Sequence, residues 1–149
     1  MNLLSRRSML AIAAVVDVAL HARPDPVAAK LLAERHRLPP RHLETILQAL
    51  VRATILKGVR GPRGGYELAT ERRRITAGDI VRAAMNGVED DLGPPEPQSA
   101  LVDQVIEPEI KTASQAFLTH LDGITVEELC QRAQKVGLNA MSESSDFAI

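Results

Sequence analysis

Residues 59–68 read Val59-Arg60-Gly61-Pro62-Arg63-Gly64-Gly65-Tyr66-Glu67-Leu68, which places two arginines on a glycine-rich turn between short apolar segments. We expect Gly64 and Gly65 to permit positive backbone φ angles, while Pro62 fixes its own φ, so that the turn projects compactly. A projecting turn with cationic side chains suits a DNA groove better than a hydrophobic core. An ordinary surface hairpin has a similar pattern, so the interpretation depends on the neighbouring segments.

Three helices are predicted before this turn. The first covers residues 5–21, and the second has Asp25 as its N-cap and Pro26 at its first helical position. A short turn at residues 36–39 leads to a third helix, which begins near Pro40. Its apolar stripe is Leu43, Ile46, Leu47, Leu50 and Val51, and its polar face carries Arg41, Glu44, Thr45 and Gln48. Two short helices, a tight turn and a polar outer face are typical of a helix-turn-helix.

The segments on either side of the arginine turn complete a winged helix-turn-helix. Residues 55–60 and 66–69 are predicted to form two strands, and a fourth helix begins at Thr76 or Gly78 and ends near Gly87. The expected fold class is therefore mainly α with a small β-hairpin. Residues 1–87 would form this winged helix-turn-helix domain.

The second half predicts a linker followed by dimerisation helices. Residues 88–104 are interpreted as an acidic, proline-rich linker, and residues 105–137 as the dimerisation helices. Pro108 fits the first turn of the fifth helix, and Thr125 to Glu128 form a capping box that opens the last helix. The tail, residues 138–149, has no periodicity and is expected to be mobile.

Charge is divided unequally along the chain. The net charge is −1, but residues 1–82 hold 15 lysines and arginines against 7 acidic residues, whereas residues 83–149 hold 3 against 12. A basic first half favours a polyanionic partner, and the acidic second half favours a separate role.

Composition limits the core and the compartment. The only aromatic residues are Tyr66, Phe117 and Phe147, so the core must be aliphatic, and a small core makes stabilisation by dimerisation plausible. Cys130 is the only cysteine, which excludes an intrachain disulfide and any multi-cysteine metal site, and fits a reducing cytoplasm.

Residues 5–16 resemble a twin-arginine export signal, which is an alternative interpretation of the first helix. Asp17 interrupts its apolar run, however, and the apolar residues follow the helical spacing of a core helix: Met9, Ile12, Ala13, Val16, Ala19 and Leu20. No stretch is long enough to span a membrane.

The ordered motifs together resemble the Rrf-two family of bacterial winged-helix transcription regulators. The matching pieces are residues 15–21 (VVDVALH), 42–47 (HLETIL), 59–66 (VRGPRGGY) and 75–81 (ITAGDIV). The similarity is strong over residues 4–87, weakens in the linker and returns at residues 124–129 (ITVEEL).

The resemblance implies a homodimer that binds double-stranded DNA at a near-palindromic operator, with a long second-half helix crossing to the partner subunit. By position, Arg41, Glu44 and Thr45 would face the major groove, Arg60 and Arg63 the minor groove, and Arg7 a phosphate. The candidate DNA-binding residues are Arg7, Arg41, His42, Glu44, Thr45, Gln48, Arg60, Arg63, Gly64, Gly65 and Tyr66.

Three departures from the family pattern alter these expectations. Thr45 replaces a common glutamine and should change the base preference, while Met9 and Leu10 replace an arginine–tyrosine pair that would contact the backbone. Sensing members carry three closely spaced cysteines after the fourth helix, and residues 88–107 contain none. We therefore expect no iron–sulfur cluster and no other cofactor.

Other functions receive less support from the sequence. No nucleophile with its base, phosphate-binding loop or paired-carboxylate site is recognisable, so an enzyme is not predicted. Cys130 could be redox-active, but a helix thiol partly buried in the core is the simpler interpretation. The histidines lack metal-ligand spacing, although a site shared across a dimer, such as His120 with Glu107 or Glu109, stays open.

Two alternatives to a DNA-binding repressor remain open. One is a winged-helix protein–protein interaction module, or a regulator controlled by a protein partner or an unknown small-molecule effector. The other is an atypical metal or cluster sensor.

Overall fold

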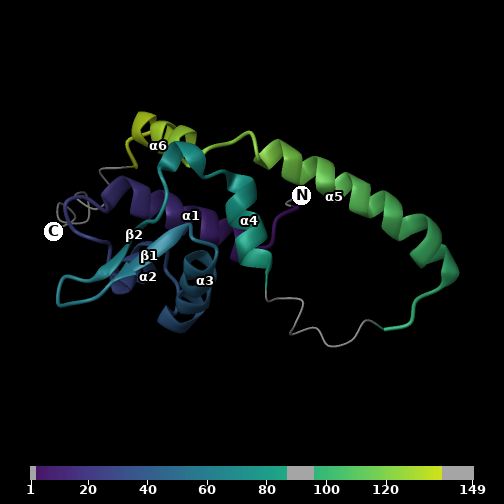
Figure 1. The fold of residues 1–149 in the computed structure, drawn as a ribbon, viewed down its shortest axis with the longest axis horizontal. Coiled ribbons are helices and arrows are strands. Elements are labelled where there is room, and N and C mark those ends of the chain that lie inside the picture. The colour runs from purple at the N-terminus through teal and green to yellow at the C-terminus, as the bar shows by residue number, and fades with distance from the viewer. Residues whose placement is uncertain (1–2, 87–95, 139–149) are drawn as a thin grey trace.

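The computed structural model describes residues 3–86 and 96–138 of the chain (Figure 1). In chain order its elements are α1 (Arg6–His21), α2 (Ala29–Arg35), α3 (Pro40–Arg52), β1 (Leu56–Val59), β2 (Gly65–Leu68), η1 (Arg72–Arg74), α4 (Ala77–Met85), η3 (Val102–Ile106), α5 (Glu107–Leu121) and α6 (Val126–Lys135). The prediction of a mainly helical fold with one small hairpin is confirmed. Residues 88–95 of the proposed linker, and all but the first residue of the proposed mobile tail, lie outside the described residues.

Helix α1 runs through the centre of the core. It begins at the N-cap Ser5, whose side chain accepts a hydrogen bond from the Ser8 backbone N–H. Its fully buried residues include Ala11, Ala14, Val15 and Val18, which follow i, i+3, i+4, i+7 spacing. The residues expected to face the core are instead half-buried or, for Met9, exposed. Because α3, α4, α6 and β2 all contact α1, its core face is wider than the sequence pattern indicated.

The hairpin pairs β1 with β2 in antiparallel register, with Leu56 opposite Leu68 and Val59 opposite Gly65. Its turn reverses at Gly61, which has φ of 119°. The expectation of positive φ at Gly64 and Gly65 is wrong. Those two positions need glycine because backbone carbonyls approach them closely: a Cβ would overlap the Val59 carbonyl oxygen at Gly64 and the Val27 carbonyl oxygen at Gly65.

The predicted start of α2 at Pro26 is also wrong, because the helix begins at Ala29. Val27 forms an isolated antiparallel bridge to Tyr66, in which each residue's backbone N–H donates to the other's carbonyl, at 2.9 and 2.8 Å. An extended backbone is needed for that pairing, so the helix cannot begin before the bridge ends. The base of the hairpin is thereby tied to the segment between α1 and α2.

The second half of the chain packs back onto the first where α6 contacts α1 and η1. Both α4 and α6 begin with a capping box, at Thr76 with Asp79 and at Thr125 with Glu128, the second as predicted. The two N-caps also pair in a short β-bridge, where the Ala77 N–H donates to the Ile124 carbonyl at 2.8 Å. This pairing joins the start of α6 to the start of α4.

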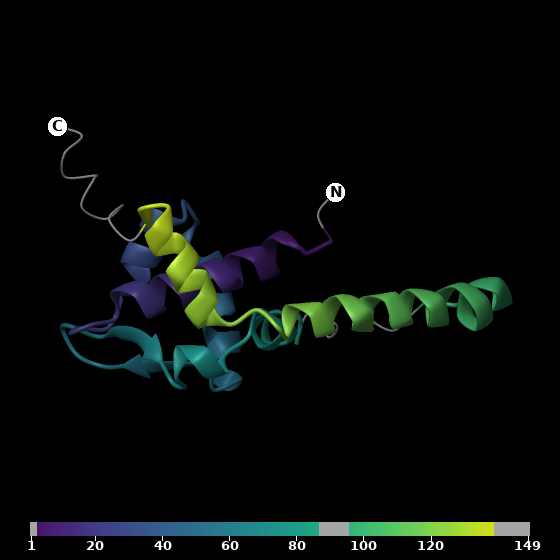
Figure 2. The same ribbon diagram turned by 90° about the horizontal axis from the view of Figure 1, so that it is seen from above.

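A long helical arm, formed by η3 and α5, extends away from this body (Figures 1 and 2). Helix begins at Ala100, so the proposed linker end at residue 104 is too late. Pro108 lies in the first turn of α5, as predicted, and η3 leads into α5 without a break. Proline has no N–H to donate to the carbonyl four residues before it, and the turn ahead of it is widened to a π-helix, in which the Glu107 N–H donates to the Val102 carbonyl.

Candidate nucleic-acid interface

Helix α3 presents a continuous polar face. Its apolar residues Leu43, Ile46, Leu47 and Leu50 are buried in the core, as predicted, although Val51 is 38% exposed. The side chains of the predicted recognition face are all exposed: Arg41, His42, Glu44, Thr45 and Gln48. A helix held by its apolar stripe and exposed along a polar one has the shape of a recognition helix.

The turn of the hairpin carries two more cations. Arg60 and Arg63 are exposed at the turn between β1 and β2, and within the described part of the chain neither has a salt-bridge or hydrogen-bond partner for its guanidinium. Figure 1 shows the hairpin projecting from the same body as α3. Unpaired arginines on a projecting turn are available to enter the narrow minor groove, where the negative potential is strongest.

Three of the predicted DNA-binding residues stabilise the wing itself. Gly64 and Gly65 allow backbone approaches, while the half-buried Tyr66 packs against the hydrophobic core and pairs its backbone with Val27. These residues hold the wing at its base. A direct contact between any of them and DNA stays a prediction.

Arg7 is not a free cation in the structure. Its Nε donates to the Ala84 carbonyl at 2.9 Å, and its Nη1 donates to the Thr45 hydroxyl oxygen at 3.1 Å. Ala84 lies in the last turn of α4, where helix carbonyls lack intrahelical donors, so an arginine is well suited to that site. Arg7 therefore joins α1, α3 and α4, a contact between two candidate residues that the sequence did not reveal.

Asp17 was not predicted as a functional residue, but it positions the helix-turn-helix. Its buried carboxylate accepts hydrogen bonds from Arg35 Nε at 2.9 Å, His36 Nε2 at 2.9 Å and His21 Nδ1 at 3.1 Å. Burial raises the pKa of Asp17, but the hydrogen bonds from His36 and Arg35 and the nearby positive charge lower it further, so the net pKa is lowered. The i, i+4 spacing of Asp17 and His21 on one helix could have indicated their contact. Arg35 and His36 are 18 and 19 positions from Asp17, so no local sequence pattern indicates their contacts with it.

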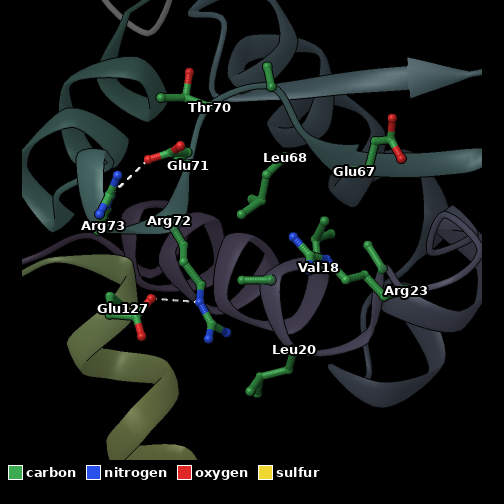
Figure 3. A pocket seen from close by; sticks show the side chains of 13 residues that line it. Val18, Leu20, Arg23, Glu67, Leu68, Thr70, Glu71, Arg72, Arg73 and Glu127 are labelled. Carbon is green, nitrogen blue, oxygen red and sulfur yellow. Dashed lines mark hydrogen bonds and ion pairs between the residues drawn. The ribbon is translucent and has the colours of Figure 1, made fainter.

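A separate groove of about 710 Å³ lies between the end of α1, β2, η1 and Glu127 of α6 (Figure 3). Val18, Leu20 and Leu68 form apolar parts of its lining. Two of its arginines are paired, Arg72 with Glu127 at 2.7 Å and Arg73 with Glu71 at 2.8 Å. None of the candidate DNA-binding residues lines it. Because its charges are largely paired with one another, the groove favours no single class of ligand.

Cys130 is buried within α6, more completely than predicted, and burial raises the pKa of its thiol. A neutral, buried thiol is a poor nucleophile and a poor metal ligand. Over residues 3–86 and 96–138, no three His, Cys, Asp or Glu side chains are grouped as a metal site would require. One cysteine per chain also cannot supply the thiolates of a cysteine-ligated cluster, so these residues do not fit one.

None of the helices among the described residues has the length and apolar character needed to cross a membrane.

Comparison with known proteins agrees with this geometry. Residues 4–132 match the model of the Rrf2 (Rrf-two) family, described as iron-dependent transcriptional regulator. The HTH-type transcriptional regulator slr0846 of Synechocystis sp. is 33% identical over 142 residues, covering 91% of this chain and 97% of that protein. IscR of Vibrio atlanticus is 34% identical over 86 residues, which span 58% of this chain and 50% of IscR.

Solved structures give the same result over most of the chain. IscR of T. potens has a TM-score of 0.70 and 30% identity, with 90% of each chain covered. CymR, the global cysteine regulator of B. subtilis, has a TM-score of 0.64 and 26% identity, with 89% of this chain and 98% of CymR covered. These relatives are transcription regulators, not enzymes. With the family match covering most of its length, the chain belongs to the Rrf2 family of winged-helix, DNA-binding transcription regulators.

Proposed function

We propose that this protein is a sequence-specific, homodimeric repressor that acts in the cytoplasm without a conventional iron–sulfur cluster. The observation that carries the proposal is the exposed polar face of α3 together with two unpaired arginines on the wing. Arg41, Glu44, Thr45 and Gln48 would face the major groove, and Glu44 could accept a hydrogen bond from a cytosine amino group. Arg60 and Arg63 would enter the adjacent minor groove.

Dimerisation is supported by the helical arm. Four large apolar residues on it are 44–61% exposed in the single chain: Leu101, Val105, Ile106 and Ile110. Apolar residues that recur along one exposed helix are covered when a second copy packs against them. The arm belongs to the acidic half of the chain, which would not attract phosphate. A two-fold dimer would then bind a near-palindromic operator, and a dimer bound over a promoter would block transcription.

The test is a mobility-shift titration with the duplex upstream of the protein's own coding region, at several salt concentrations. We expect binding to weaken as salt rises, with a log–log slope of about −0.9 for each phosphate neutralised. The double variant Arg60→Ala with Arg63→Ala should bind much more weakly and with a shallower slope.

A matched control removes two cations elsewhere. Arg132→Ala with Lys135→Ala makes the same change in charge on α6, in the acidic half, and should leave both affinity and slope nearly unchanged. The proposal fails if wild type shows no salt-dependent binding, or if the wing variant binds as well as the control. Transcription from the same promoter in a purified system, with and without the protein, then distinguishes repression from activation.

A further inference from the structure

Thr45 occupies the centre of the exposed face of α3, but its hydroxyl group is already engaged within the protein. The hydroxyl donates its only proton to the His42 carbonyl at 3.0 Å. The oxygen also accepts a hydrogen bond from Arg7 Nη1 at 3.1 Å. The side chain therefore has no proton left to donate to a base.

This arrangement excludes several modes of base recognition. The acceptors of the major groove are N7 and O6 of guanine, N7 of adenine and O4 of thymine, and each needs a donor from the protein. Thr45 can offer only one remaining lone pair and its methyl group. A threonine methyl group makes apolar contact with the C5-methyl group of thymine, which is unique to that base in the groove.

Arg7 fixes which way this methyl group is held. The guanidinium is anchored at the end of α4 by the bond from Nε to the Ala84 carbonyl, at 2.9 Å. The same guanidinium donates through Nη1 to the Thr45 hydroxyl oxygen. That hydroxyl in turn donates to the His42 carbonyl, one turn earlier in α3. Two bonds to one oxygen select a single staggered χ1 rotamer, so the methyl group has one fixed position on an exposed residue.

We infer that Thr45 reads a thymine C5-methyl group through its own methyl group, and that Arg7 is the positioning residue that sets its orientation. This inference rests on the proposed DNA-binding function. It specifies the base that is recognised, thymine, and the group on that base that Thr45 contacts, the C5-methyl group. Arg7 then contributes to sequence discrimination, beyond the uniform attraction of a cation for phosphate.

The test uses a duplex that the protein itself enriches from a randomised library. Each thymine is replaced in turn by deoxyuridine, which lacks only the C5-methyl group. For wild type we expect one thymine per half-site at which replacement weakens binding by about fourfold, the factor for one buried methyl group. Thr45→Ser keeps the hydroxyl and lacks the methyl group, so this penalty should disappear. Thr45→Val keeps a methyl group but loses the oxygen that holds it in place, so its penalty should be smaller than that of wild type without disappearing.

The Arg7→Lys variant separates positioning from phosphate binding. Lysine keeps the positive charge but cannot bond the Ala84 carbonyl and the Thr45 hydroxyl with the fixed fork of a guanidinium. We expect its salt slope to equal that of wild type while its deoxyuridine penalty falls. A phosphate role alone would leave the penalty unchanged. Thermal melting of each variant checks that the fold is intact.

The outcomes separate this inference from the function beneath it. If no duplex is enriched, the proposed function fails and the inference falls with it. If binding is specific and salt-dependent but no deoxyuridine replacement weakens it, or if Thr45→Ser keeps the full penalty, the inference alone is overturned. An Arg7→Lys variant with the wild-type penalty overturns the role given to Arg7.

Discussion

At the scale of single residues, Asp17 shows how one buried charge can position a DNA-binding motif. Its carboxylate on α1 receives hydrogen bonds from Arg35 at the end of α2 and from His36 in the turn before α3. Three donor side chains offset the cost of burying the charge, and they fix the turn of the helix-turn-helix against α1. Asp17 therefore holds the turn before α3 in place through its contacts with Arg35 and His36.

Asp17→Asn should destabilise the protein strongly. The change leaves Arg35 without its ion pair and removes the charge that two histidines contact, so we expect a loss of about 3 kcal/mol in the free energy of unfolding at pH 7. Urea unfolding measures it. The control Glu71→Gln breaks the exposed ion pair with Arg73 and should cost less than about 1 kcal/mol. Equal losses in the two variants would contradict the role of Asp17.

The same comparison has a defined pH dependence. The pKa of Asp17 is lowered from its ordinary value of 3.8, so the stabilisation is complete above that pH and is lost as pH falls through the folded-state pKa. The difference in unfolding free energy between wild type and Asp17→Asn should thus shrink as pH falls below about 4. A difference that shrinks already between pH 7 and 5 would point to another group.

At the scale of elements, the helices, the hairpin and the capping box at Thr125 were predictable because each is encoded by local spacing. The errors arose where distant segments override local preference. Pro26 is a good first helical residue, yet the pairing of Val27 with Tyr66 keeps that segment extended. The glycines after Arg63 were assigned a turn role, whereas one of them is needed because that distant segment passes close to it.

In the candidate DNA-binding site, too, the features encoded by local spacing were predictable and the contacts between distant residues were not. The exposed face of α3 and the wing arginines follow from periodicity and turn chemistry, and all of them are exposed as expected. The contact between Arg7 and Thr45 joins residues 38 positions apart, so no local pattern could reveal it. Asp17 and Arg35 are separated in the same way.

Gly65→Ala tests the close approach at the base of the wing. The added methyl group would meet the Val27 carbonyl, so we expect a loss of about 1–3 kcal/mol and weaker DNA binding, because the wing must shift. Gly58→Ala is the matched control in the paired strand, since a Cβ there meets nothing within 4 Å. That variant should be neutral or slightly more stable. Thermal unfolding compares the two, and equal stability would contradict the account of the wing base.

At the scale of the whole molecule, the proposed function assigns DNA binding and dimerisation to two different parts of the structure. The basic body carries α3 and the wing, and the acidic arm extends from it (Figure 2). Large apolar residues of the arm are exposed in the single chain. Neither part is sufficient for operator recognition as proposed. Two bodies must be held at a fixed spacing by paired arms to match two half-sites, about one helical turn or a multiple of it apart.

Ile110→Glu should convert a dimer to a monomer. Ile110 is 60% exposed near the middle of the arm, and burying a glutamate against a second copy is strongly unfavourable. Gln115→Glu adds the same charge about 140° around the helix, since each residue turns about 100°, and should leave the dimer intact. Light scattering after size exclusion measures the mass. A wild-type monomer, or an Ile110→Glu dimer of unchanged stability, would contradict the role of the arm.

Selection of duplexes from a fully randomised library, followed by sequencing of the bound fraction, tests sequence-specific recognition by a two-fold dimer most directly. Our account predicts an enriched inverted repeat whose half-sites are separated by about one turn of DNA or a multiple of it, because the two copies of α3 are related by a two-fold axis. The enrichment should disappear in the Arg60→Ala with Arg63→Ala variant. A single unrepeated motif, or no enrichment by wild type, would contradict it.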